Sequence, residues 1–179
     1  TAEAVPGMLF VTDAGGHNRS VNTYYRDYTG KSAEELSGDG WAEIVHPDDL
    51  PVAIDASARA LAEGKAFSAS YRLRRHDGQY RWHSTKATPT RNESGEIVQW
   101  IGVSLDIHDQ REAEEQARSA AEEIEAIYAS APVGLTVLDR DLRYVRINER
   151  LAEINGMPVE QHLGKTVRQV VPGLADQLE

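Results

Sequence analysis

The sequence predicts an α+β fold: a five-stranded antiparallel sheet with small helices on one face, followed by a long connecting helix. Three observations support this prediction. Two short strands and several short helical segments precede three long alternating strands, an order typical of one antiparallel sheet covered on one side. The stretch after the last strand is rich in helix-forming residues and lacks Gly and Pro. Beyond it the opening pattern returns, which indicates the first half of a second domain of the same kind.

The composition is that of an ordinary globular chain and excludes several classes of function. The 179 residues are 40% hydrophobic and 27% charged and include no cysteine, which excludes disulfides, thiolate metal sites and cysteine nucleophiles. A formal charge of −10 would repel phosphate backbones, so we expect no nucleic-acid partner. No run is long enough to cross a bilayer and no signal segment is present, so we expect a cytoplasmic segment without membrane contact. Because the chain begins with Thr1, we expect it to be part of a longer polypeptide.

The first domain opens with a hairpin and a short helix. Residues 9–13 and 19–22 are predicted strands, joined by a turn rich in Gly and Asn, which tolerate positive φ angles. A short helix is predicted over residues 23–28, and Gly30 is a plausible stop for it.

Two further helices are predicted before the long strands. Residues 32–38 (SAEELSG) have the spacing of a capping box and end in Gly, which predicts a small capped helix. The stretch HPDDL at residues 46–50 predicts the start of a longer helix, because Pro suits the first helical position and aspartates favour the positive end of the helix dipole. We expect Gly64 to end this helix. Its expected inner face consists of Val52, Ile54, Ala58 and Leu61.

Three long strands complete the predicted sheet. The first alternates, with Phe67, Ala69, Tyr71 and Leu73 on one face. The dipeptide Asp77-Gly78 predicts a tight hairpin turn, and the turn NESG separates the second strand from the third. The loop length decides which face of the sheet His83 occupies: a two-residue loop leaves it outside, and a three-residue loop turns it inward.

The C-terminal segment repeats the N-terminal one. Moved back by 126 positions without gaps, it aligns turn, cap and core residues, among them Pro132 with Pro6, Leu135 with Leu9, Asp139 with Asp13, Asn148 with Asn22 and Gly156 with Gly30. Matches at such positions indicate a tandem repeat. The sequence therefore divides into a domain at 1–106, a connecting helix at 107–131 and the N-terminal part of a second domain at 132–179. This last part lacks the three long strands, so we expect it to be unstable alone.

The connecting helix carries an apolar seam. Its members recur at spacings of four and three residues, typical of a coiled coil: Ala113, Ala117, Ala120, Ile124, Ile127 and Ala131. The seam indicates either a parallel dimer contact that carries a signal between domains or a solvated spacer helix packed on its own domain. Small alanines bury little area, so we expect only weak association from the helix alone. We expect a further dimer contact at the outer face of the last strand, through Ile101, Val103 and Leu105.

In combination these features resemble a PAS domain, the sensory module of bacterial signalling proteins. The resemblance rests on the order of the elements and on the motifs HPDD, YRLRRHDGQYRW and GVSLDIHDQREAE, the last of which is similar to the family's exit (PAC) motif. It covers residues 1–108 and implies tandem PAS domains joined by a helix, with Asp106, Ile107 and His108 transmitting the signal at the exit. His108 stands where that motif usually carries Thr, so the usual hydroxyl contact is not expected there.

The resemblance also bears on cofactors, because PAS pockets between sheet and helices can hold haem, flavin or small metabolites. Leu73, His83 and Ser104 stand where flavin-binding relatives carry Asn, Asn and Gln, which argues against photoactive flavin. The long helix contains no histidine to serve as a haem ligand. We therefore expect neither haem nor flavin, and both an empty pocket and a small metabolite remain open. The candidate pocket residues are Tyr28, Trp41, Tyr71, His83 and Ser104.

We expect no catalysis and no metal site in these residues, because the sequence has no nucleophile elbow, phosphate-binding Gly loop or metalloprotease motif. The resemblance implies a sensory and dimerisation module of a prokaryotic two-component signalling protein, such as a sensor histidine kinase. A homodimer would relay the state of a ligand or partner through the helix to a kinase or cyclase domain in the same polypeptide. Two alternatives remain open: a haem- or flavin-bound redox or gas sensor, and a ligand-free protein-interaction scaffold.

Overall fold

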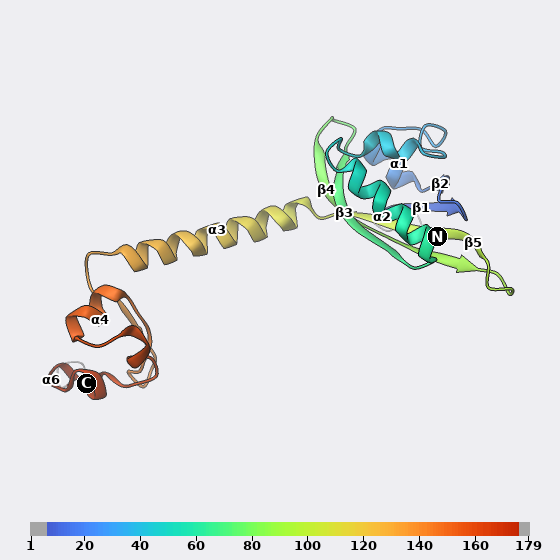
Figure 1. The fold of residues 1–179 in the computed structure, drawn as a ribbon. Helices are drawn as coiled ribbons and strands as arrows, with labels where there is room; N and C mark the ends of the chain where they lie inside the picture. The colour runs from blue at the N-terminus through green and yellow to red at the C-terminus, as the bar shows by residue number, and fades with distance from the viewer. Residues whose placement is uncertain (1–6, 176–179) are drawn as a thin grey trace. The chain divides into compact units, whose positions relative to one another are not determined.

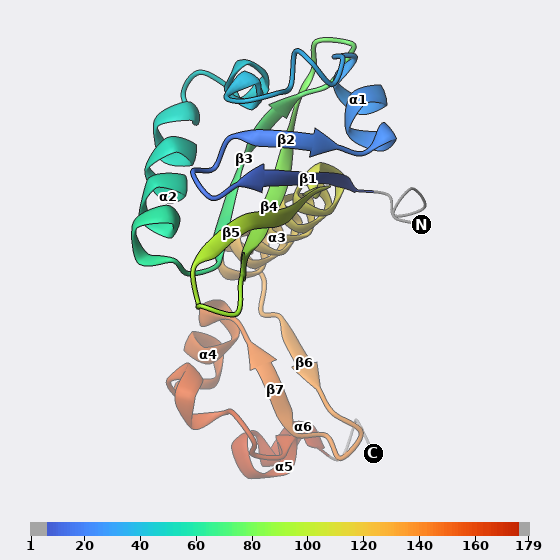
Figure 2. The ribbon, with the colours of Figure 1, turned by 90° about the vertical axis from the view of Figure 1, so that its right-hand side faces the viewer.

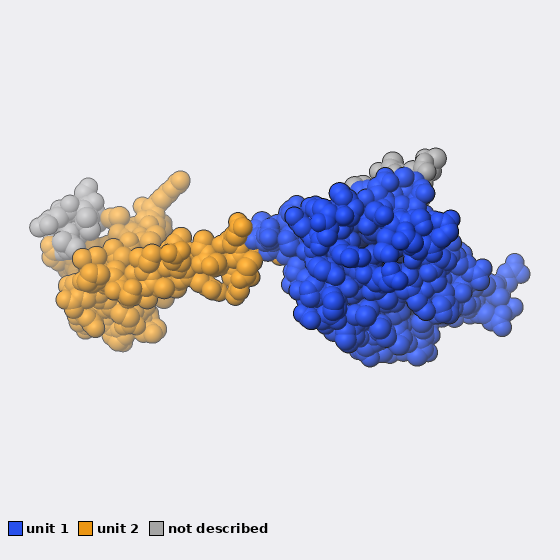
Figure 3. Space-filling view, turned by 90° about the horizontal axis from the view of Figure 1, so that it is seen from above, with its two compact units in different colours: residues 1–113 blue, residues 114–179 orange. Residues whose placement is uncertain are grey.

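The computed structural model of the protein describes residues 7–175. The chain forms two compact units, Thr1–Ala113 and Glu114–Glu179, which Figure 3 shows in separate colours. The boundary falls within the connecting helix α3 (His108–Ser130), so the start of this helix belongs to unit 1 and the rest to unit 2. Within the described part of the chain, no helix has both the length and the hydropathy that a membrane span requires.

Unit 1 contains the predicted five-stranded antiparallel sheet, and the α+β fold class is confirmed. The strands lie in the spatial order β2-β1-β5-β4-β3 (Figures 1 and 2). The N-terminal strand pairs with the last strand in the middle of the sheet, which places the domain's first and final elements side by side. The strands are β1 (Met8–Asp13), β2 (Asn18–Val21), β3 (Phe67–Arg74), β4 (Tyr80–Arg91) and β5 (Ile97–Asp106).

Helical segments cover one face of this sheet. They are α1 (Thr23–Thr29), the 3₁₀ helix η2 (Gly40–Ile44) and α2 (Leu50–Glu63). The core between helices and sheet includes Met8, Leu36, Ile44, Ala53, Tyr71 and Leu73. Helix α1 agrees with its prediction: the Asn22 side chain accepts the Tyr25 amide at its start, and Gly30 ends it with a φ of 69°.

The hairpin between β3 and β4 has the three-residue loop. The Arg75 amide donates to the Gln79 carbonyl over 2.8 Å, which leaves three residues between them. The third of these, Gly78, has a φ of 88°, a conformation that residues with a Cβ adopt only at a cost. In this register Tyr71 pairs with His83, and the His83 side chain faces the core, fully buried.

The segment predicted as a small capped helix is a series of hydrogen-bonded turns at residues 33–36. The capping-box contacts themselves are present, because the Ser32 hydroxyl accepts the Glu35 amide and the Glu35 carboxylate accepts the Ser32 amide. The helix prediction was wrong because the chain returns to the sheet immediately afterwards. Gly38 exchanges two backbone hydrogen bonds of 2.9 Å with Asn18, which leaves no room for a second helical turn.

Helix α2 begins at Leu50, three residues later than the first helical position predicted at Pro47. Residues 47–49 form a turn. The Asp49 side chain does not cap the helix and instead accepts hydrogen bonds from the Arg72 backbone amide and guanidinium at 2.7–2.9 Å. This strong partner on β3 explains why the aspartates do not start the helix as predicted.

The buried face of α2 also differs from its prediction. Val52 and Ile54 are 58% and 50% exposed, whereas Ala53 is fully buried. The residues of α2 that face the sheet are Ala53, Ser57, Ala60 and Leu61. The prediction is thus correct for Leu61 and wrong for Val52, Ile54 and Ala58, which are exposed, because small side chains form most of the inner face.

Unit 2 reproduces the beginning of unit 1 on a smaller scale. Its core contains Tyr144, Ile147, Ala152 and Val167. The elements after α3 are β6 (Thr136–Leu138), β7 (Tyr144–Ile147), α4 (Glu149–Asn155), the 3₁₀ helix η3 (Val159–Gln161), α5 (Val167–Val170) and α6 (Pro172–Ala175). Strands β6 and β7 form a two-stranded antiparallel sheet.

The repeat extends to individual hydrogen bonds. The Asn22 side-chain oxygen accepts the amides of Leu9 and Tyr25, each at 3.0 Å. Its counterpart Asn148 accepts the amides 126 positions later, those of Leu135 and Leu151, at 2.8 and 3.0 Å. Each asparagine therefore caps a helix and fixes the first strand of its own copy, which a chance likeness of sequence would not produce.

Candidate ligand pocket and helix junction

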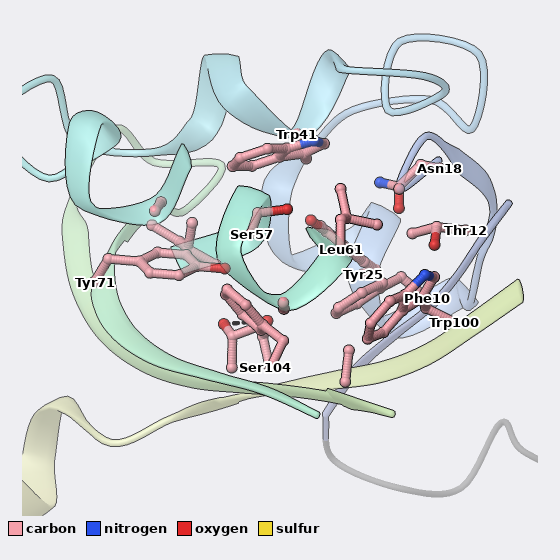
Figure 4. Close-up of a pocket in the computed structure, with 17 residues that line it drawn as sticks. Phe10, Thr12, Asn18, Tyr25, Trp41, Ser57, Leu61, Tyr71, Trp100 and Ser104 are labelled. Carbon is pink, nitrogen blue, oxygen red and sulfur yellow. Dashed lines mark hydrogen bonds between the residues drawn. The ribbon is translucent and has the colours of Figure 1, made fainter. Parts of the chain in front are cut away.

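A cavity of about 80 Å³ lies between the inner face of the sheet and the helices. Helix α2 closes one side through Ser57 and Leu61, and the strands form the floor (Figure 4). Aromatic side chains from five different elements surround the space: Phe10, Tyr25, Trp41, Tyr71 and Trp100. The cavity is therefore a concave, largely apolar site of the kind that holds small molecules.

Hydroxyl groups are concentrated on the floor of the cavity. The Thr85 and Ser104 side chains, which face each other across β4 and β5, share a hydrogen bond of 2.7 Å between their oxygens. Tyr71 on β3 lies beside them, and burial raises the pKa of its phenol to about 12 although the Thr85 hydroxyl acts in the opposite direction. These groups are uncharged at neutral pH.

Three of the five candidate pocket residues line the cavity, namely Trp41, Tyr71 and Ser104. Tyr28 and His83 do not line it. They pack against each other beside it, with ring centroids 5.1 Å apart in an edge-to-face arrangement. His83 is two residues before Thr85 on the same face of β4, so it lies one step closer to the start of α3.

His83 is fully buried and carries an unpartnered nitrogen. Its Nδ1 lies 2.8 Å from the Arg81 carbonyl, so Nδ1–H is the donor and Nε2 keeps its lone pair. Within the described residues, no partner reaches this Nε2. Burial lowers the pKa of His83, with smaller opposing effects from the Arg81 carbonyl and Asp106. The neutral imidazole is therefore the form that the fold accommodates.

Asp106, at the end of β5, connects three elements. It accepts hydrogen bonds from the Tyr28 hydroxyl of α1 at 2.8 Å and from the Arg81 Nε of β4 at 2.6 Å. It also accepts the amide of His108, the first residue of α3, at 2.9 Å. Arg81 in turn donates to Asp109 in the first turn of α3 at 2.8 Å.

The groups at this junction shift each other's pKa values. Burial opposes ionisation of Asp106, but the hydrogen bonds from Arg81, the His108 amide and Tyr28 outweigh it and hold the pKa of this carboxyl at about 2. The pKa of Tyr28 is raised, first by burial and then by its hydrogen bond to Asp106. At neutral pH the junction therefore contains a carboxylate, a guanidinium and a neutral phenol.

Two further contacts tie the start of α3 to β4. The Ile107 amide donates to the Trp82 carbonyl at 2.9 Å. The Arg111 guanidinium lies 4.1 Å from the centroid of the Trp82 ring, a cation–π contact. The candidate transmission residues Asp106, Ile107 and His108 are thus brought together at one junction. His108 also approaches Glu112 one turn further along the helix, at 3.2 Å.

The residues expected at a dimer contact are on surfaces. Ile101 and Leu105 are 47% and 41% exposed on the outer face of β5, where Val103 lies between them. Ile124 and Ile127 are 61% and 62% exposed on α3. No residue of α3 is buried, Ala117 included.

Arg81 and Thr85 are functional candidates that the sequence analysis did not select. Both depend on the hairpin register, which places residues 81, 83 and 85 on the inner face. In the sequence, both residues are separated from His83 by two positions, so all three side chains lie on the same face of the strand. This spacing identifies the inner face only when the loop length is known. Ser57 was missed for a different reason, because the inner face of α2 was assigned to the larger apolar residues.

Two family models, both described as a PAS fold, match residues 19–104 and 128–179. The chain is also similar to the solved structure of an RNA-binding light-oxygen-voltage receptor. That likeness has a TM-score of 0.59 and 25% sequence identity, and covers 68% of this chain and 35% of the receptor chain.

Among curated proteins, the protein y4lL of Sinorhizobium fredii is 30% identical over 163 residues, which are 91% of this chain and 20% of that protein. The peroxide stress-activated histidine kinase mak1 of Schizosaccharomyces pombe is 28% identical over 151 residues, which are 79% of this chain and 9% of the kinase. The chain thus spans a fifth or less of the length of these relatives. Because one of them is a fungal kinase, the likeness is not restricted to prokaryotes.

Proposed function

This chain belongs to the PAS family of sensory domains, and on that premise we propose that it passes the state of its pocket to the connecting helix. The observation that carries this proposal is the spacing of two residue pairs on β4 and β5. Thr85 and Ser104 lie on the cavity floor, and the next inward-facing pair is His83 with Asp106. One step along the strands therefore separates a ligand site from the junction that anchors α3.

The pairing of β4 with β5 supports a relay through direct contacts between the cavity floor and α3. Strands β4 and β5 are paired continuously from Asp106 to Gln99, so a displacement of the floor moves both strands together. Arg81 on β4 donates a hydrogen bond to Asp109 in the first turn of α3, and the Ile107 amide donates one to the Trp82 carbonyl of β4. These two contacts hold the start of the helix to the strand. Pocket occupancy would shift the population between two packings of this junction.

The working unit in this proposal is a homodimer, and the sequence divides into a sensor at 1–106, a linker at 107–131 and a second domain at 132–179. Exposed Ile124 and Ile127 on α3 and exposed Ile101 and Leu105 on β5 offer two apolar surfaces for a second copy. The resemblance of the exit segment to a PAC motif supports a linker that lies between sensor and output. A histidine kinase domain elsewhere in the same polypeptide, as in the relative mak1, would supply the catalytic output.

The size of the cavity favours a small ligand over a large cofactor. About 80 Å³ is about half the volume of an engineered apolar cavity that binds benzene, and haem or flavin is several times larger than benzene. An absorption spectrum of the purified protein between 300 and 700 nm tests this directly. A haem or flavin band would replace the proposed small-ligand sensor with a redox or gas sensor.

The relay is tested by amide hydrogen exchange in the first turn of α3. The variant Ala87→Ile fills the cavity from β4, and Thr88→Ile adds a comparable side chain on the opposite face of the same strand. We expect the cavity variant, and not its control, to change exchange at residues 107–112 by about tenfold or more, which corresponds to about 1.4 kcal/mol of local stability. Equal exchange in both variants would refute the relay.

The dimer is tested separately by sedimentation of the wild-type chain and of the double variant Ile124→Glu/Ile127→Glu. Two carboxylates at these seam positions should weaken self-association at least tenfold. The matched control is Glu123→Ala/Glu125→Ala on the same helix, which removes charge without touching the seam. A wild-type chain that remains monomeric at millimolar concentration would contradict the dimer.

A further inference from the structure

The cavity has no charged group in its wall. Among the described residues, the 17 that line it include no Asp, Glu, Lys, Arg or His. Side-chain polar atoms come from hydroxyls, from the indole N–H groups of Trp41 and Trp100, and from the Asn18 amide, whose Nδ2 already donates to the Leu36 carbonyl at 3.1 Å. The rest of the wall is apolar or aromatic. A ligand that enters this space thus loses its hydration and finds no ion to pair with.

This wall discriminates by charge. Moving an ion from water into an apolar site without a counter-charge costs several kcal/mol, whereas an alcohol or carbonyl needs only one hydrogen-bond partner. The charged groups of the region, Arg81 and Asp106, neutralise each other at the junction and do not line the cavity. Carboxylates, phosphates and ammonium compounds are therefore disfavoured by the site itself.

One pair of these polar groups, the Thr85 and Ser104 hydroxyls, offers a site for a single oxygen. Figure 4 shows Tyr71 and Ser104 at one end of the space, with Phe10, Tyr25 and Trp100 at the other. The Thr85–Ser104 hydrogen bond uses one hydroxyl proton and leaves the second proton and lone pairs available. One end of the cavity thus offers both a donor and an acceptor. At the opposite end the aromatic rings lie beside the Thr12 hydroxyl and the Asn18 amide.

The volume limits the size of the guest. A cavity of about 150 Å³ accommodates benzene, with its six heavy atoms, so one of about 80 Å³ suits roughly three to five heavy atoms. A molecule of this size with one oxygen and an apolar tail is a short alcohol, aldehyde or ketone.

We propose that the cavity of unit 1 binds small neutral molecules with one hydroxyl or carbonyl oxygen, of about three to five heavy atoms, and excludes their charged analogues. The oxygen of the guest contacts the Thr85 and Ser104 hydroxyls, and its carbon chain packs among Phe10, Tyr25 and Trp100. The effect of the bound molecule on α3 rests on the proposed function, since it requires the relay to operate. The binding itself does not depend on the relay.

The test is a titration of the uniformly ¹⁵N-labelled chain of residues 1–179 with 1-butanol, butyrate and butylammonium at pH 7 and constant ionic strength. These probes share a four-carbon tail and differ in charge. We expect saturable amide shifts at residues 85 and 104 with butanol, at a millimolar dissociation constant. We expect butyrate and butylammonium to bind at least tenfold more weakly. Charged probes that bind as tightly as butanol would overturn the charge exclusion.

Variants locate the guest. Ala87→Ile occupies the cavity and should abolish the saturable shifts, whereas Thr88→Ile on the outer face should leave them unchanged. Thr85→Val preserves the shape of the side chain and should weaken butanol severalfold through loss of a hydroxyl. If Ala87→Ile does not fold, Thr85→Val alone decides the question. Saturable butanol binding that Thr85→Val leaves intact would overturn the assignment, as would an absence of saturable binding in the wild type.

The same titration separates this inference from the proposed function. Butanol shifts confined to the cavity, without any change at residues 107–112, would refute the relay and leave the ligand class intact. Shifts at residues 107–112 induced equally by all three probes would refute the ligand class and leave the relay intact.

Discussion

The ion pair between Arg81 and Asp106 should contribute measurably to the stability of unit 1, and a double-mutant cycle tests this. The changes are Arg81→Met, Asp106→Asn and the two combined. Arg81→Met leaves the Asp106 carboxylate, whose side chain is only 20% exposed, without its guanidinium. Asp106→Asn removes the charge and keeps the shape of the acceptor. The double variant should therefore lose less stability than the sum of the losses of the two single variants.

The magnitude follows from the environment of the pair. A fall of the Asp106 pKa from 3.8 to about 2 corresponds to about 2.5 kcal/mol of preferential stabilisation of the carboxylate. Part of this comes from the His108 amide and Tyr28, and residual solvent access screens the rest, so we expect a coupling energy of about 1–2 kcal/mol between the two residues. The direction of the pKa shift also determines how this stabilisation changes with pH. The folded pKa lies below the unfolded value, so this stabilisation is complete above about pH 4 and is lost as the pH falls towards 2.

Tryptophan fluorescence during urea unfolding is the appropriate assay. The three tryptophans, Trp41, Trp82 and Trp100, all lie in unit 1, so the signal reports that unit alone. The matched control is the cycle Asp55→Asn/Arg59→Met on α2, whose side chains are 66% and 68% exposed, and its coupling should stay below about 0.5 kcal/mol. A junction coupling no larger than that of the control would refute the argument that this junction holds α3 to the sheet.

Three further predictions use the same signal. His83→Gln should remove part of the pH dependence of the free energy of unfolding. Because burial lowers the pKa of His83, the wild type loses stability as the pH falls below about 6.5, by at most about 1.4 kcal/mol per pH unit. A variant whose stability changes with pH as steeply as that of the wild type would contradict the buried neutral imidazole. Asn22→Ala should cost about 2 kcal/mol because one side chain caps α1 and fixes β1, whereas the equivalent Asn148→Ala should leave the tryptophan transition unchanged; equal effects would show that the two units unfold together. Gly102→Ala should cost about 1–3 kcal/mol, because the added Cβ would overlap the Phe10 ring, and unfolding at the wild-type midpoint would show that the ring moves freely.

The elements that could be predicted from the sequence are those specified by local chemistry. Asn22 and Gly30 determine the ends of α1, and alternation determines the inner face of β3, so both were predicted correctly. Helix α2 differs, because the size of its inward side chains depends on the sheet that they face. Its inward face carries Ala53 and Ser57, while the larger Val52 and Ile54 face solvent, and side-chain hydrophobicity alone cannot indicate that the sheet requires small residues there. The start of this helix was misplaced because the partner of Asp49 is 23 residues away, on β3.

The candidate site was only partly predictable for a related reason. Trp41, Tyr71 and Ser104 could be assigned to the pocket from the resemblance, but Arg81 and Thr85 require the hairpin register. The sequence left two loop lengths open, and each implies a different set of inward residues. Asp77-Gly78 signals a turn in both, so turn chemistry alone could not decide between them. The choice depends on which set of side chains the core accepts, which is a property of the whole domain.

The loop length of this hairpin therefore links the pocket to the junction. Residues 81, 83 and 85 are all inward because the loop has three residues, and a shift by one position would turn all three to the opposite face. Thr85 would leave the cavity floor and Arg81 would leave Asp106 in the same step. The cavity floor and the junction that anchors α3 thus depend on the same strand register. They are consecutive inward positions of one strand, and the fold cannot keep one of them in place while it loses the other.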